Sequence, residues 1–324
     1  MPRVSLIVPN WNGAHRLREL FDCLARQTYP IHRILVVDNG STDNSSDVAA
    51  AAGASLIALN SNTGFSHAVN CGIRAADSEW IGILNNDVCP QSDWLRNLME
   101  AATAANSWFV AGKLLDAAHR DRLDGAFDAI CRGACAWRCG HGRPDSELWN
   151  KPRQIRFAPF TAAIFRKDLF DQVGLLDETF ESYLEDVDFG IRCATRGFTG
   201  LYVPQAVAYH EGSATLGKWH PDTVRKLSRN QLLLVAKHYP RKWILRYGWP
   251  VLVAQTLWGA TAFRQGRFVA YLRGKLEGLR LFRKIRGNSH PTLPVLLEQS
   301  ENEIRELQAL TGFDLYWKLY FALT

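Results

Sequence analysis

The sequence lacks the glycine-rich phosphate-binding loops of many nucleotide enzymes. No G-x-G-x-x-G follows the first predicted strand, and no G-x-x-x-x-G-K-[ST] occurs in the 324 residues. These absences argue against a dinucleotide-dependent dehydrogenase and against a P-loop enzyme. A nucleotide bound to this chain would need a metal ion to neutralise its diphosphate.

A regular cysteine framework is also absent. The chain has seven cysteines, an odd number, so we expect reduced thiols and a cytoplasmic protein. Three of them stand with a histidine as Cys131-x3-Cys135-x3-Cys139-x-His141. Because this spacing lacks the second close pair of a usual zinc site, we favour a loop with incidental thiols, with zinc as the alternative.

Long apolar runs are missing as well. The run at residues 4–9 is too short for a signal peptide. Residues 247–263 carry no charge over 17 residues, but Pro250, Gln255 and Thr256 interrupt them. A membrane-spanning helix needs about 20 apolar residues, so we do not expect this segment to cross a bilayer.

Acidic residues are scarce in one part of the chain. Residues 218–289 contain 16 Lys or Arg against two acids, which gives +14 in a chain whose net charge is +6. Within them, residues 266–286 alternate basic residues with Leu and Phe at helical spacing. This composition is typical of a helix on an anionic membrane surface. The alternatives are packing on the rest of the chain or on a second copy. Nucleic acid is not expected as a partner, because no recognised nucleic-acid-binding module accompanies the charge.

What the sequence does contain is a regular alternation of strands and helices. Strands are predicted at residues 4–8, 34–37, 55–59 and 80–84, of which 34–37 and 80–84 read as buried. The segments between them have helical apolar spacing. Such alternation predicts an α/β protein with a mostly parallel sheet flanked by helices. Beyond residue 105 the pattern is irregular, with short strands predicted at 160–165, 200–203 and 207–209.

Each early strand ends in polar residues, and together they predict a ligand crevice. The carboxyl ends of parallel strands meet at one edge of a sheet, where ligands bind. The triplet Asn85-Asn86-Asp87 has the spacing of an Asp-x-Asp metal clamp whose first Asp is replaced. A hard divalent cation prefers oxygen ligands, so Asp87 is a candidate ligand, although a strand-ending turn is the alternative.

Two later clusters also carry candidate chemistry. Glu185, Asp186 and Asp188 open a helix whose amino end favours negative charge, so helix capping and catalysis are both possible roles. His210 ends a predicted strand beside Gly212 and Ser213. A lone histidine is usually structural, but this position would also suit a metal ligand.

Six stretches, in this order, resemble the family-2 glycosyltransferases of the GT-A fold, most of all their bacterial rhamnosyltransferase-like members. The stretches are VSLIVPNWNG, ILVVDNGSTDNS, NTGFSHAVNCGI, WIGILNNDVCP, VGLLDETFESYLEDVDFGIRCATRGF and VAYHEGSATLG. The resemblance implies a catalytic domain at residues 1–217, with a nucleotide-sugar half (1–105) and an acceptor half (106–217). The basic, largely helical region 218–324 would then associate with a membrane or form a homo-oligomer.

The resemblance also implies a role for each crevice residue. Asp186 matches the catalytic base, with Glu185 as a neighbour that orients or tunes it. Asp87 and His210 match ligands of magnesium or manganese, and Asn85 stands where many relatives carry Asp, which removes one charge from the clamp. The nucleotide sugar would be bound by Pro9, Asn10, Asn12, Asp38, Asn62 and Gly64, with Asp38 on the pyrimidine base.

The implied function is inverting transfer of a sugar from a UDP- or dTDP-sugar to a glycan or lipid-linked glycan, and the family branch suggests rhamnose as that sugar. This would occur on the inner face of the cell membrane, in cell-envelope polysaccharide biosynthesis. A carboxylate base acting in a single displacement inverts the anomeric centre, and a metal ion stabilises the leaving diphosphate. Two alternatives are a sugar-nucleotide pyrophosphorylase, whose glycine-rich basic loop is absent, and a catalytically inactive membrane-associated scaffold of the same fold.

Overall fold

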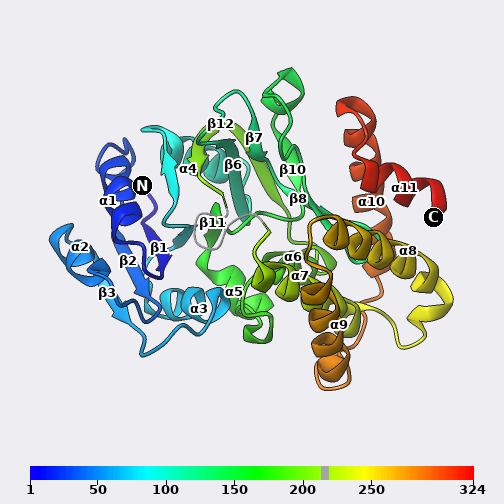
Figure 1. Ribbon diagram of the computed structural model, residues 1–324. Coiled ribbons are helices and arrows are strands. Elements are labelled where there is room, and N and C mark those ends of the chain that lie inside the picture. The colour runs from blue at the N-terminus through cyan, green and yellow to red at the C-terminus, as the bar shows by residue number, and fades with distance from the viewer. Residues whose placement is uncertain (213–218) are drawn as a thin grey trace.

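The computed structural model describes residues 1–212 and 219–324. Residues 213–218, which end the last of the six stretches quoted above, lie outside the described residues. The main sheet has the order β10-β12-β6-β11-β4-β1-β2-β3, with β5 paired to β12 and β7 to β6 (Figure 1). Its strands are β1 (Val4–Asn10), β2 (Arg33–Asp38), β3 (Ser55–Ala58), β4 (Trp80–Leu84), β5 (Val88–Pro90), β6 (Phe109–Asp116), β7 (Leu123–Gly125), β10 (Arg153–Ile155), β11 (Ala162–Arg166) and β12 (Gly200–His210).

Helices cover both faces of the sheet and form the C-terminal part of the chain. A separate hairpin pairs β8 (Asp128–Ile130) with β9 (Ala136–Arg138), and two 3-10 turns are η1 (Glu147–Asn150) and η2 (Glu178–Phe180). The helices are α1 (Ala14–Leu24), α2 (Ser45–Ala51), α3 (Phe65–Ala75), α4 (Trp94–Ala104), α5 (Lys167–Val173), α6 (Glu185–Thr195), α7 (Pro221–His238), α8 (Trp243–Arg264), α9 (Phe268–Phe282), α10 (Leu293–Thr311) and α11 (Leu315–Leu323).

The first four strands form the predicted parallel sheet. β1 lies between β2 and β4, and β3 pairs with β2, all in parallel. Successive side chains of a strand point to opposite faces, so each strand feeds two hydrophobic cores. Ile7 and Ile83 pack with α3 on one face, whereas Leu6 and Leu84 pack with α1 and α4 on the other. The runs at residues 4–8, 34–37 and 80–84 are therefore largely buried on both sides, whereas the edge strand β3 is partly exposed, with Leu56 38% exposed.

The second half of the sheet is mixed. β11 is antiparallel to both β4 and β6, and β12 then runs parallel to β6. The two short strands predicted at 200–203 and 207–209 are one strand, β12, with a register shift between Val203 and Val207. Pro204 interrupts the apolar alternation there, and the irregularity accommodates it without ending the strand. A parallel half followed by a mixed half, with helices appended, confirms the predicted fold class.

The C-terminal helices share a core with the rest of the chain. Leu233 and Leu234 of α7 pack in one cluster with Phe180 and Val187, and Leu297 of α10 joins them. In Figure 1 these helices gather on the side of the molecule away from β1–β3. The residues described include no helix long and apolar enough to cross a membrane. The division at residue 217 stays a prediction.

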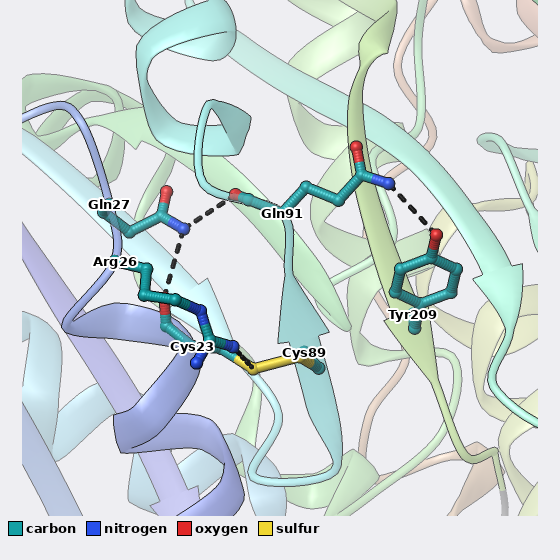
Figure 2. Close-up of a disulfide and its surroundings, with 6 residues drawn as sticks. All are labelled: Cys23, Arg26, Gln27, Cys89, Gln91 and Tyr209. Atoms are coloured by element: carbon teal, nitrogen blue, oxygen red, sulfur yellow. Dashed lines mark hydrogen bonds between the residues drawn. A yellow bond between two sulfur atoms is a disulfide. The ribbon is translucent and has the colours of Figure 1, made fainter.

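Two of the seven cysteines are paired, which corrects the expectation that all are reduced. Cys23 of α1 and Cys89 of β5 form a disulfide, with Cα atoms 5.7 Å apart (Figure 2). They are 66 residues apart in sequence, and only the packing of α1 beside β5 brings them together. The bond joins α1 to the strand that directly follows Asp87. Gln91, just beyond β5, donates to Tyr209 Oη at 3.0 Å and so links the same segment to β12 (Figure 2).

The cysteine-rich stretch of residues 131–141 belongs to the β8–β9 hairpin. Cys131, Cys135 and Cys139 are buried in the hydrophobic core, and His141 Nδ1 contacts the carbonyl of Asp124. Within the described residues, no group of three His, Cys, Asp or Glu side chains is arranged to hold a metal ion. The spacing considered for zinc therefore forms no such cluster there.

Candidate active site

A polar network joins the carboxyl ends of β1, β2 and β4. Asn86 Nδ2 donates to Asn10 Oδ1 at 2.7 Å, and Asn10 Nδ2 donates to Asp38 Oδ1 at 3.2 Å. The other oxygen of Asp38 accepts from the amide of Ser41 at 3.3 Å. Asn10 and Asp38 are almost fully buried. The network brings together two predicted donor-site residues and adds Asn86, which sequence reasoning had treated only as part of the triplet.

Two more predicted residues border this network. Asn12 has a left-handed backbone (φ 48°), and its side chain accepts from the amide of Thr42 at 2.8 Å. Its own amide donates to Ser41 Oγ at 2.8 Å. Pro9 stands in register with Val37 on the neighbouring strand. These bonds hold together the loops after β1 and β2, which form one wall of the predicted crevice.

The turn before α3 supplies a second wall. Asn39 Nδ2 donates to Asn62 Oδ1 and to the carbonyl of Gly64, both at 3.1 Å. Gly64 has φ +90°, and a Cβ there would meet the carbonyl oxygen of Glu181 at 2.9 Å. Glycine is therefore required at this position, because a side chain would strain this backbone conformation and would clash with Glu181. The contact brings the turn that carries Asn62 and Gly64 against the loop that leads into α6.

The loop before α6 is strained and held from two sides. Glu181, Tyr183 and Leu184 all have positive φ, which is costly for residues with side chains. Asn230 of α7 donates to the carbonyls of Phe180, Ser182 and Tyr183, at 2.9, 3.0 and 2.7 Å. The C-terminal helices thus fix the position of the first turn of α6, where Glu185 and Asp186 lie.

His210 lies between two carboxylates at the end of β12. Its Nε2 is 3.3 Å from Asp87 Oδ1, and its Nδ1 is 2.8 Å from Asp124 Oδ2. Burial would lower the pKa of His210, but the bonds to Asp124 and Asp87 outweigh it and raise the pKa to about 9. Burial would raise the pKa of Asp124, but the bond from His210 and the charge of Arg138 outweigh it and lower that pKa.

Arg138 connects this cluster with the acids of α6. Its guanidinium is 3.2 Å from Asp124 Oδ2 and 3.5 Å from Asp128 Oδ1. Its charge also acts on Asp186 and Glu185. Asp87 and Asp186, 99 positions apart in the chain, therefore stand at the two ends of one charged network.

Two acids in the first turn of α6, Glu185 and Asp186, have raised pKa values. Burial raises the pKa of Asp186, against the charge of Arg138 and a hydrogen bond from the amide of Val187. Burial also raises the pKa of Glu185, with the charge of Asp186 adding to the shift. Glu185 Oε2 is buried without a hydrogen-bond partner, which a neutral carboxyl tolerates better than a carboxylate. A raised pKa brings Asp186 closer to the working range of a general base.

The residues present fit a divalent cation. Asp87 Oδ1 is buried and, apart from the ion-pair contact with His210, has no hydrogen-bond partner. Asp124 on the far nitrogen of His210 is the usual arrangement that orients a metal-binding imidazole. Asn85 precedes this carboxylate at the end of β4, and its amide nitrogen donates to the carbonyl of Thr161 at 2.9 Å. Two protein ligands leave room for diphosphate oxygens and water, the usual set for such ions.

Sequence reasoning missed three residues of this site: Asp124, Asp128 and Arg138. All lie in the irregular part of the chain, on or beside β7, β8 and β9. No strand-helix periodicity marks that region, so their convergence on His210 and Asp186 had no local signal. Two acids and two arginines within the 15 residues 124–138 were the only available hint.

The chain combines a parallel sheet that has polar loops at its carboxyl edge with a mixed half that carries acids. The sequence model of Glycosyl transferase family 2 matches residues 5–174. That is more than half of the chain, and the protein belongs to this family of glycosyltransferases. The recognised resemblance is thereby confirmed.

Relatives by sequence are themselves glycosyltransferases. The chain is 27% identical to the N-acetylglucosaminyl-diphospho-decaprenol L-rhamnosyltransferase of Mycobacterium tuberculosis, over 72% of this chain and 86% of that protein. It is 25% identical to the pre-mycofactocin glycosyltransferase of the same species, over 67% of this chain and 44% of that protein. The rhamnosyltransferase-like branch expected from the sequence is thus found among its relatives.

Solved structures share the fold at low sequence identity. A mannosyltransferase from Pyrobaculum calidifontis, in complex with GDP-Man and Mn²⁺, superposes with a TM-score of 0.54 at 16% identity, covering 99% of this chain and 86% of that one. GalNAc-T7 with UDP, GalNAc and Mn²⁺ gives 0.64 at 13% identity, covering 97% of this chain and 58% of that one. Both support the GT-A-like fold.

Proposed function

We propose that this glycosyltransferase moves a sugar, with inversion, from a pyrimidine nucleoside diphosphate to a hydroxyl of a lipid-linked glycan, and that Asp186 is the general base. The observation that carries the proposal is the network that runs from Asp87 through His210, Asp124 and Arg138 to Asp186. It supports one catalytic centre rather than two separate clusters. The family and its rhamnosyltransferase relative support the acceptor class and a role in cell-envelope glycan synthesis.

Asp186 accepts the proton that the acceptor hydroxyl loses as it attacks the anomeric carbon. A base opposite the leaving group, acting in one displacement, gives inversion. Burial raises the pKa of Asp186 and the charge of Arg138 opposes that rise, a combination that suits a carboxylate that accepts a proton in the transition state.

Asp87 and His210 would hold magnesium or manganese. Because Asn85 stands at the first position of the clamp, the site has one negative charge fewer than an Asp-x-Asp clamp. A bound divalent ion supplies charge stabilisation for the leaving diphosphate. Asp124 keeps His210 Nε2 directed at Asp87. The donor would occupy the crevice bordered by Pro9, Asn10, Asn12, Asp38, Asn62 and Gly64, with Asp38 on the pyrimidine base.

The test is Asp186→Asn in the full chain. We expect a loss of turnover of about 10²–10⁴-fold or more, the scale of general-base catalysis, with nucleotide-sugar binding retained. Binding is measured by a thermal-shift panel of UDP-, dTDP- and GDP-sugars with and without Mn²⁺, because a ligand of the native state raises its stability.

Asp171→Asn is the matched control, because Asp171 is an exposed acid on the neighbouring α5. It should leave both turnover and binding unchanged. Unchanged turnover in Asp186→Asn would remove Asp186 from the mechanism. Absence of any donor shift in the unmodified protein would favour the alternative, an inactive scaffold of the same fold.

A further inference from the structure

One face of α8 is apolar and exposed along its length. Residues 245, 249, 252, 256, 260 and 263 follow one another at intervals of three or four, so they lie on one side of the helix. They are uncharged, and four of them are large: Leu245, Trp249, Leu252 and Phe263 are 58–85% exposed. The opposite side of α8 carries Val251 and Ala254 into the protein core.

α9 continues this apolar surface. Val269, Leu272, Leu276 and Leu279 are 44–63% exposed and recur at helical spacing. The ring of Phe268 at the start of α9 contacts Phe263 at the end of α8, with centroids 5.8 Å apart. We call the eight exposed side chains of α8 and α9, from Leu245 to Leu279, the α8–α9 face.

The orientation of α9 is fixed by its other side. A Cβ at Gly274 would lie 2.1 Å from the carbonyl oxygen of Arg225, and one at Gly278 would lie 3.0 Å from that of Arg229. Only glycine lets α9 approach α7 this closely. With its glycine side pressed on α7, the leucine side of α9 must face outward.

Basic side chains border the α8–α9 face. The exposed cations on α8, α9 and the turn after them make no ion pair with an acid of the described residues. The one acid on either helix, Glu277, pairs with Arg225 at 2.5 Å and is neutralised. The exposed cations are Arg246, Arg264, Arg273, Arg280, Arg283 and Lys284.

We infer that the α8–α9 face docks the enzyme on an anionic lipid bilayer. Leucine and aromatic side chains flanked by Lys and Arg are the composition of helices that lie in a membrane interface. Anionic lipid attracts each basic residue. In water alone, the apolar side chains of the face remain exposed to solvent. A second copy is a poor occupant, because a twofold contact through this face would press like charges together.

The docked orientation brings the bilayer close to the catalytic half. A hollow of about 370 Å³ opens at the border of the face, between the starts of α7 and α9, and its charged lining is Arg225, Arg267 and Arg273 with one acid, Asp222. Thr223, beside the hollow, contacts Tyr183 Oη at 3.0 Å, three residues before Asp186. This step rests on the proposed function: a lipid-linked acceptor would present its phosphate at the hollow and its sugar toward Asp186.

The test is co-sedimentation of the full chain with vesicles. We expect binding to phosphatidylcholine vesicles that contain phosphatidylglycerol at low salt, release at high salt, and little binding to phosphatidylcholine alone. The pair Leu272→Glu and Leu276→Glu, and separately the pair Arg280→Glu and Arg283→Glu, should each weaken binding by about tenfold or more. Leu310→Glu on α10 and Arg18→Glu on α1 are matched exposed controls outside the face.

Folding is checked by the thermal midpoint of each variant, which should stay close to that of the unmodified protein. Absence of binding to anionic vesicles at low salt overturns the inference, as does full binding by both paired variants. A dimer in solution that the Leu272 and Leu276 changes dissociate, without vesicle binding, would assign the face to a second copy instead. Vesicle binding needs no turnover, so failure of the docking and failure of the proposed reaction are separate results.

Discussion

Asp124 holds the imidazole of His210 from the side opposite Asp87. The Nδ1–Oδ2 distance is 2.8 Å, and both side chains are more than nine-tenths buried. A buried carboxylate on one ring nitrogen fixes which way the other nitrogen points. In the proposed function, Asp124 is therefore a positioning residue for the proposed metal ligand His210, and Arg138 compensates its charge.

Asp124→Asn should weaken Mn²⁺ binding about 10–100-fold, the usual cost of losing such a partner of a metal-binding histidine. The amide keeps the shape of the side chain but removes the charge that holds His210. Titration of the protein with Mn²⁺ in the presence of UDP, followed calorimetrically, measures the change without turnover. Asp121→Asn, an exposed acid three positions earlier, is the control. Equal Mn²⁺ affinity in Asp124→Asn and the unmodified protein would contradict the assignment.

The residues of the site divide into those marked by a pattern and those brought in by folding. Asp87 and His210 end strands, and Asp186 opens a helix, so periodicity and the family resemblance both pointed to them. Asp124 and Arg138 lie on short strands of three residues, where no periodicity can be read. Their role depends on side-chain contacts across the fold, which local sequence does not encode.

At the scale of elements, Asp188 joins α6 to α7. It is fully buried, and its carboxylate contacts Arg192 at 3.0 Å, Lys237 at 2.8 Å and His238 at 2.7 Å. Burial would raise the pKa of Asp188, but Arg192, His238 and Lys237 outweigh it and hold the pKa well below its usual range. The third acid of the helix opening is thus structural, in contrast to Asp186.

Asp188→Asn should lower the free energy of unfolding at pH 7 by about 3–5 kcal/mol, because it leaves buried cations unpaired. A carboxyl with a lowered folded-state pKa stabilises the fold above its unfolded pKa of about 4 and loses this effect as pH falls below it. The difference between variant and unmodified protein should therefore shrink between pH 5 and pH 3, in urea titrations. Asp47→Asn, an exposed acid of α2, should show no such trend. A difference that does not depend on pH would argue against the ion pairs.

The Cys23–Cys89 disulfide is a second link between elements. It closes a 66-residue segment and anchors β5 directly after the proposed metal ligand Asp87. Cys23→Ser should lower the free energy of unfolding by about 2–4 kcal/mol, since the unfolded chain regains freedom. The thermal midpoint of the unmodified protein should fall on addition of reductant, and that of Cys23→Ser should not. Cys71→Ser is the control, because Cys71 is a free cysteine. Equal midpoints with and without reductant would show that the bond carries no stability.

For the molecule as a whole, the C-terminal helices complete the catalytic part. Leu233 and Leu234 of α7 cover Phe180 and Val187, and Asn230 holds the strained loop before α6. The region expected from sequence to be an appendage therefore contributes to the core beside the base. Its outer side carries the exposed α8–α9 face, which we infer to dock on a lipid bilayer.

A chain ending at residue 217 should fail to reach the native fold. Loss of residues 218–324 would expose Phe180, Leu184 and Val187 and remove the hydrogen bonds from Asn230. Near-ultraviolet circular dichroism and size-exclusion chromatography measure this outcome, with the full chain as the reference. A folded, nucleotide-binding fragment 1–217 would instead support the predicted domain division as an independent unit.

By itself, the sequence determined the fold class, the first four strands and the family, because these depend on local periodicity and on motifs at strand ends. It also marked Asp87, Asp186 and His210 as candidate site residues, each within a motif. Only the tertiary structure decided which cysteines pair, that β12 is one strand, and that Asp124 and Arg138 connect the two ends of the site. These features arise from contacts between segments far apart in the chain, and their geometry is set when the sheet and its helices pack together.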